Sequence, residues 1–175
     1  MADRLDIDRK FMKLAAPLLS DGRWREMTRF VQHGRTTCLT HCMAVAYYSL
    51  LFVEVLRIPC DRRSLVRGAL LHDYFLYDWH ESGSGHRFHG FTHPAAALEN
   101  AARDFDLNEV ERNIIARHMF PLVPIPPKYR EGVIVCTVDK CCSLYETFSQ
   151  SRAYTSSGAI RPERFGRTRE PKRKV

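Results

Sequence analysis

The stretch Ala69-Leu70-Leu71-His72-Asp73-Tyr74 places a histidine directly before an aspartate at the end of an apolar run. Leu65, Ala69 and His72 fall near helical spacing, which predicts that a helix carries the pair. Neighbouring residues on a helix project about 100° apart, so both side chains reach one cavity if it lies at the helix end. Imidazole and carboxylate suit zinc, iron and manganese. The pair is therefore a candidate metal site, although His-Asp dipeptides also occur by chance.

Four residues of the same chemistry recur at separations of about one helix plus a loop: His41, His93, His118 and Asp139. His41 lies on the apolar stripe of a predicted helix, where a lone histidine is more often a hydrogen-bonded core residue than a ligand. Asp139 lies among the apolar residues of another predicted helix. An ionised aspartate is costly to bury without a cation or several hydrogen-bond donors. Asp139 is therefore the most informative single residue after the His-Asp pair.

The composition predicts one soluble domain followed by a basic tail. The chain has 175 residues, of which 45% are hydrophobic and 27% charged. Residues 151–175 contain eight Lys and Arg against two Asp and Glu, so they carry six of the seven net positive charges. We expect a domain over residues 1–150 and a flexible tail over 151–175. Such a tail can contact nucleic acid or an acidic partner, but a solvated terminus is the simpler interpretation.

Nothing near the first residue indicates secretion or membrane insertion. The chain begins with charged residues and no apolar signal segment follows. The longest apolar run, around residues 42–53, is shorter than the ~20 residues needed to cross a bilayer. We therefore expect a cytoplasmic protein without a membrane segment, whose six cysteines are free thiols.

Hydrophobic periodicity predicts an all-α fold without useful β structure. Asp61 is the expected N-cap of the helix that carries the His-Asp pair. Asn108 and Glu111 form a capping-box pattern, and Pro94 places His93 near a helix start. A polar loop over residues 80–90 reads equally well as a binding loop or as a solvated loop. The expected helices cover residues 3–20, 24–32, 37–57, 61–76, 108–118 and 130–148, with a further one starting near His93.

The order His41 … His72-Asp73 … His93 … His118 … Asp139 resembles the HD-domain superfamily of metal-dependent phosphohydrolases, over about residues 35–150. The resemblance implies an all-α bundle of about six to seven helices with a central metal site. It implies that a first divalent ion is held by His41, His72, Asp73 and Asp139. It also implies that Asp73 bridges to a second ion completed by His93 and His118.

The chemistry implied by the resemblance is hydrolysis by metal-activated water. One carboxylate, here Asp73, can hold two cations about 3.5–4 Å apart and leave room for a bridging water, whose pKa the cations lower. Lys140 is a candidate phosphate ligand next to Asp139, although it reads equally well as a surface lysine. The ions would be one or two of Fe, Mn, Zn, Co, Ni or Mg.

The sequence departs from the family pattern in three places. Many members have lysine where this chain has Leu76, which removes one candidate phosphate ligand or general acid. The Gly-Tyr-Pro signature of cyclic-dinucleotide enzymes is absent, so that substrate is not expected. Met119 follows His118, where some two-metal members have a second histidine. The expected function is hydrolysis of a nucleotide or another small phosphate ester. A di-iron oxygenase and a non-catalytic nucleotide-binding module are the alternatives.

Overall fold

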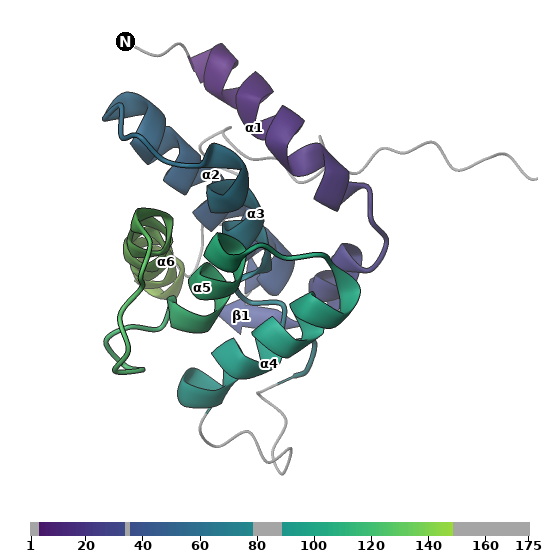
Figure 1. Ribbon diagram of the computed structural model, residues 1–175. Helices are drawn as coiled ribbons and strands as arrows, with labels where there is room; N and C mark the ends of the chain where they lie inside the picture. Colours follow the sequence, from purple (N-terminus) through teal and green to yellow (C-terminus); the bar gives the residue numbers. More distant parts are fainter. Residues whose placement is uncertain (1–3, 34–35, 79–88, 149–175) are drawn as a thin grey trace, which may run out of the picture.

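The computed structural model describes residues 4–33, 36–78 and 89–148, and the fold over these residues is an all-α bundle (Figure 1). The predicted fold class is confirmed, with six α-helices and one 3-10 helix in the described residues. Residues 80–88 of the predicted loop over residues 80–90 lie outside the described residues, and so does the basic tail. The elements are α1 (Arg4–Leu19), η1 (Trp24–Arg29), β1 (Val31–His33), β2 (Thr36–Thr37), α2 (Cys38–Val55), α3 (Arg62–Leu71), α4 (His89–Asp104), α5 (Glu109–Arg117) and α6 (Arg130–Phe148).

Helix α2 is the core helix, and it packs against α3 and α6. The Thr37 hydroxyl caps its first turn by accepting from the Thr40 amide at 3.2 Å. Its last turn closes where the Ile58 amide donates to the Val53 carbonyl at 2.9 Å, with Arg57 in the left-handed region at φ 55°. In the described part of the chain, α2 is long and apolar enough to span a membrane by length and composition alone. However, 61% of it is buried inside the fold, as expected for the core helix of a soluble protein.

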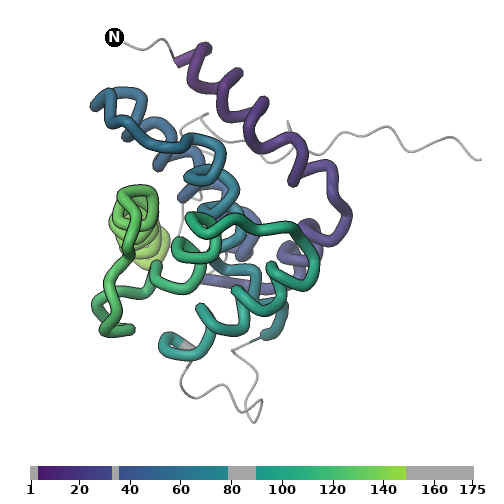
Figure 2. Tube along the Cα trace, in the orientation of Figure 1, coloured from purple at the N-terminus to yellow at the C-terminus, as the bar shows by residue number. Residues whose placement is uncertain are grey.

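Helices α3 and α5 lie side by side and carry histidines at their C-terminal ends. Both predicted caps are confirmed: Asp61 accepts from backbone amides of α3, and Asn108 and Glu111 form a reciprocal capping box on α5. Gly68 allows close approach, since a Cβ there would lie 2.5 Å from Ile114 Cδ1. Figure 2 shows α5 between α4 and α6, both of which it contacts. The C-cap residues of α3 and α5 are His72 and His118.

Several predicted element boundaries were wrong. Helix α3 ends at Leu71 rather than continuing to Leu76, which adopts φ 55°. The helix predicted over residues 24–32 is a 3-10 helix that ends at Arg29 and leads into β1, which pairs antiparallel with β2. Helix α4 begins at His89 and has Pro94 inside it, so His93 is not at its start. Proline there removes one N–H from the second turn, yet α4 continues to Asp104 with Ala97 and Ala101 buried.

Candidate metal centre

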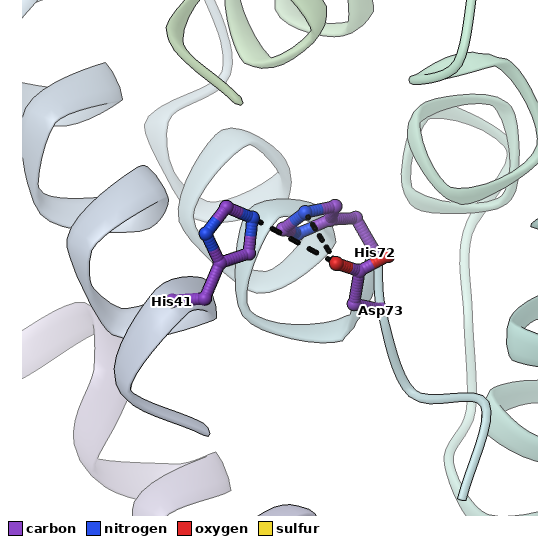
Figure 3. A group of neighbouring side chains, drawn as sticks. All are labelled: His41, His72 and Asp73. Atoms are coloured by element: carbon purple, nitrogen blue, oxygen red, sulfur yellow. Dashed lines mark ion pairs between the residues drawn. The ribbon is translucent and has the colours of Figure 1, made fainter. Parts of the chain in front are cut away.

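The Asp73 carboxylate lies at the centre of four histidines and faces them with different oxygens. Oδ2 lies 3.7 Å from His41 Nε2 and 3.4 Å from His72 Nε2. Oδ1 lies 3.2 Å from His93 Nε2 and 3.4 Å from His118 Nε2. Figure 3 shows His41 and His72 directed toward one oxygen of Asp73. Asp73 therefore presents one oxygen to each of two histidine pairs.

Asp139 joins the first of these pairs from α6. Its Oδ1 lies 3.0 Å from His41 Nε2 and 3.6 Å from His72 Nε2. Two groups of potential ligands result: His41, His72 and Asp73, with Asp139 beside them, and Asp73, His93 and His118. All six side chains are buried. The structure thus brings together the six residues that the sequence singled out, from α2, α4, α6 and the ends of α3 and α5.

Helix ends orient two of the histidines. The last carbonyls of an α-helix have no intrahelical partner, and a C-cap histidine can donate to them. His72 Nδ1 lies 2.7 Å from the Ala69 carbonyl, and His118 Nδ1 lies 2.8 Å from the Ile115 carbonyl. Because a carbonyl oxygen only accepts hydrogen bonds, each Nδ1 carries a proton. The Nε2 atoms, which face Asp73, are thereby left as the metal-binding atoms.

The electrostatics of the first group favour positive charge at its nitrogens. Burial lowers the pKa of His41, but the carboxylates of Asp139 and Glu146 outweigh it and hold that pKa well above its usual value. Burial likewise lowers the pKa of His72, but Asp73, Cys42 and Asp139 together outweigh it and the net shift is upward. Burial raises the pKa of Asp73, yet its histidine neighbours hold that pKa well below its usual range. The raised pKa values show that the surroundings of His41 and His72 favour positive charge, so a metal cation suits the positions that these protons occupy.

The donor set fits divalent ions. Within the described residues, His72 Nε2 and Asp73 Oδ1 are buried and have no hydrogen-bond partner. Buried polar atoms of this kind are rare in folded proteins and require an explanation, such as a bound ion. Burial lowers the pKa of His118, which keeps its imidazole neutral, the form that binds metals. The four imidazoles and two carboxylates are ligands for Zn, Fe, Mn or Co.

Two residues that contact the centre were not predicted from the sequence. The Glu146 carboxylate accepts a hydrogen bond from His41 Nδ1 at 3.0 Å, and Gln32 Nε2 donates to Asp73 Oδ2 at 2.6 Å. Glu146 follows Asp139 by seven residues, about two helical turns, so the shared face of α6 was a usable signal. Gln32 had no such signal, because it lies on a short strand that the sequence did not predict.

Lys140 lies beside this centre, at the junction of α5 and α6. Its ammonium donates to the His118 carbonyl at 3.0 Å, to the Cys136 carbonyl at 3.2 Å and to the Cys136 thiol at 3.0 Å. An ammonium has three donors. A contact with a substrate phosphate would therefore require Lys140 to give up at least one of these acceptors.

The comparisons with known proteins agree with this geometry. The HD-domain family matches residues 38–144, which is more than half of the 175 residues and includes all six clustered side chains. Neither the search of curated proteins nor the search of solved structures found a match. The extent of the family match and the buried His/Asp groups within it show that the chain belongs to the HD-domain family, whose activity is of the metal-dependent hydrolase type.

Proposed function

We propose that this protein is a metal-dependent phosphohydrolase that acts on a nucleotide or another small phosphate ester. The proposal depends on the way the two carboxylate oxygens of Asp73 face different histidines. Oδ2 faces His41 and His72, and Oδ1 faces His93 and His118. A carboxylate shared in this way can hold two cations in one site. Asp73 is accordingly the residue to which we assign the central catalytic role.

The charges of the ligand set support an anionic substrate. The carboxylates of Asp73 and Asp139 contribute two negative charges, and neutral imidazoles contribute none. Two divalent cations would therefore leave the site with net positive charge, which attracts phosphate and stabilises negative charge in its transition state. When bound, such cations also lower the pKa of water and make hydroxide available at neutral pH.

The protein's own residues then have defined tasks. His72 and His118, fixed by their Nδ1 hydrogen bonds to Ala69 and Ile115, direct Nε2 toward the centre. Glu146 does the same for His41 through a carboxylate. Ligands held by partners of this kind need little reorganisation on binding an ion, which favours tight and specific coordination.

The decisive experiment measures metal content and phosphatase activity together. The purified full chain is loaded with Mn²⁺, Fe²⁺, Co²⁺ or Mg²⁺ and assayed with a panel of nucleotides, phosphomonoesters and phosphodiesters. We expect turnover that depends on metal and is lost in Asp73→Asn together with bound metal. Metal-loaded protein without turnover of any substrate would contradict hydrolysis, and tight nucleotide binding in that protein would favour a non-catalytic module.

A di-iron oxygenase is the second candidate, because a histidine-rich two-metal ligand set suits iron. Two observations would favour it: iron retained through purification, and oxygen consumption under reducing conditions in the absence of phosphate release. Substitution of iron by Mn²⁺ separates the two functions, since hydrolysis needs no redox change at the ion whereas oxygenation does.

The setting and partners of the activity are also part of the proposal. We place it in the cytoplasm, where free thiols such as the six cysteines persist. Contact with nucleic acid is assigned to the basic segment 151–175, which lies outside the described residues. Salt-dependent binding of single-stranded RNA or DNA by the full chain, lost when the Lys and Arg of this segment are replaced by Ser, would support that contact.

A further inference from the structure

The segment before α2 is tied to the turn that carries the His-Asp pair. Three side-chain hydrogen bonds join them, at 3.0 Å, 2.6 Å and 3.2 Å: Trp24 Nε1 to the Leu70 carbonyl, Gln32 Nε2 to Asp73 Oδ2, and the Tyr74 hydroxyl to the Arg23 carbonyl. This segment lies outside residues 38–144, to which the family match is confined. The hydrogen bonds nevertheless reach Leu70 and Tyr74, which lie two residues before and after His72, and Asp73 itself.

Gln32 makes the contact closest to the metal centre. Its side chain is buried, and its amide nitrogen lies 2.6 Å from Asp73 Oδ2. The orientation of the amide follows from its neighbours. A carboxylate only accepts hydrogen bonds, so the NH₂ group faces Asp73. The Cys38 thiol, whose pKa burial raises, stays protonated and donates to Gln32 Oε1 at 3.5 Å.

This hydrogen bond restricts the rotation of the Asp73 carboxylate. The terminal torsion of an aspartate is broad, so packing or a hydrogen bond must select its angle. With Oδ2 held by Gln32, Oδ1 is the oxygen that faces His93 and His118. The donor occupies one side of Oδ2 and leaves its other lone pair for an ion between His41 and His72.

We propose that Gln32 is a positioning residue for the reaction, which fixes the bridging carboxylate of Asp73 so that each oxygen serves one ion. The inference rests on the proposed function, because it needs Asp73 to be a metal ligand. It extends the metal centre to a strand beyond the matched family region. Outer residues that hold metal ligands change metal affinity or activity by about 10- to 100-fold when replaced.

The test uses Co²⁺ as the probe and Gln32→Met as the variant, since methionine has a similar length and no N–H donor. We expect the variant to bind Co²⁺ about 10- to 100-fold more weakly by competition with a chelator. We also expect its Co²⁺ visible absorption bands to shift, because the ligand field changes when Asp73 rotates. In hydrolysis assays, kcat should fall while KM stays close to the wild-type value.

Trp24→Phe is the matched control. It removes another buried hydrogen bond between the same segment and the same turn, but the acceptor of that bond is the Leu70 carbonyl rather than Asp73. We expect it to lower thermal stability and to leave both the Co²⁺ spectrum and the Co²⁺ affinity unchanged. If both variants shifted the spectrum equally, Gln32 would have only a structural role and the proposal would be overturned.

Further outcomes separate this inference from the proposed function. Wild-type protein that binds Co²⁺, with a Gln32→Met spectrum and affinity identical to wild type, would overturn the inference and leave the proposed function intact. Wild-type protein that binds no Co²⁺ or any other divalent ion would overturn both. Gln32→Asn, whose amide is one methylene too short, is the second variant, and failure of both variants to fold would show a structural role and overturn the inference.

Discussion

His93 Nε2 and His118 Nε2 lie 2.8 Å apart, and both face Asp73 Oδ1. Each atom is a potential electron-pair donor, so a proton or a cation between them relieves their repulsion. Nitrogen ligands lie about 2.0–2.1 Å from Zn²⁺, which separates two ligands of one tetrahedral ion by roughly 3.3 Å. The spacing of these two nitrogens is therefore within roughly 0.5 Å of that of two ligands of a single ion.

Replacement of either histidine should remove one ion and leave the other. In His93→Ala and His118→Ala we expect the metal content to fall from two ions per chain toward one, because His41, His72, Asp73 and Asp139 remain. Elemental analysis after gel filtration in limiting metal measures this directly, with far-UV circular dichroism as the check on folding. Unchanged metal content in both variants would refute the two-group arrangement.

Glu146 should control metal affinity through His41. Its carboxylate accepts from His41 Nδ1 at 3.0 Å and increases the basicity of Nε2, which contacts Asp139. We expect Glu146→Ala to weaken metal binding about 10- to 100-fold. Glu146→Gln, which keeps an acceptor but loses the charge, should have a smaller effect. Chelator competition gives both values.

Glu131→Gln is the matched control for these variants. Glu131 is a buried glutamate on the same helix, and it accepts from the Asp61 amide at 2.8 Å, away from the metal centre. Its replacement should leave metal affinity at the wild-type value. Equal losses of affinity at positions 131 and 146 would show that any buried charge on α6 matters, and not the contact with His41.

The loss of stability with rising pH should disappear when metal is bound. In metal-free protein the pKa values of His41 and His72 lie above their usual value of 6.5. The unfolded chain loses these protons near pH 6.5, whereas the folded protein retains them to higher pH. Their contribution is therefore fully present below pH 6.5 and is lost as pH rises through the folded values. Metal binding displaces the same protons, so it strengthens over that range.

Thermal unfolding with EDTA or with saturating Mn²⁺ tests this difference. In EDTA, Tm should fall as the pH rises from 6.5 to the raised pKa values of His41 and His72. The Tm increment produced by Mn²⁺ should grow over the same range. A metal-free Tm that rises with pH across this window, in protein shown to be free of metal, would contradict the assigned charge states.

The α3–α5 contact should tolerate no added volume at Gly68. A Cβ there would lie 2.5 Å from Ile114 Cδ1 and 3.1 Å and 3.2 Å from two further atoms of the same branched side chain. Overpacking of this kind costs about 1–3 kcal/mol, and alanine regains at most about 1 kcal/mol of helix propensity. We expect Gly68→Ala to lower the free energy of unfolding in urea. Gly22→Ala, where a Cβ meets nothing within 4 Å, is the control and should be neutral.

Local sequence signals predicted the helices better than their ends. Asp61 and Asn108 mark helix starts because a side-chain cap is a local interaction. Pro94 misled the prediction, since its preference for a helix start was overridden by packing of α4 on α5. The strands β1 and β2 are too short to produce an alternating pattern, and their pairing shows only in three dimensions.

The sequence by itself determined the all-α fold and the six side chains of the candidate centre, because helical periodicity and a costly buried aspartate are properties of residue type and spacing. Only the tertiary structure decided how the atoms are arranged. It divided the Asp73 oxygens between two histidine pairs, directed Lys140 to the end of α5, and placed Glu146 on His41 and Gln32 on Asp73. Such contacts join residues that are distant in the chain, so their distances and directions depend on how helices and strands pack.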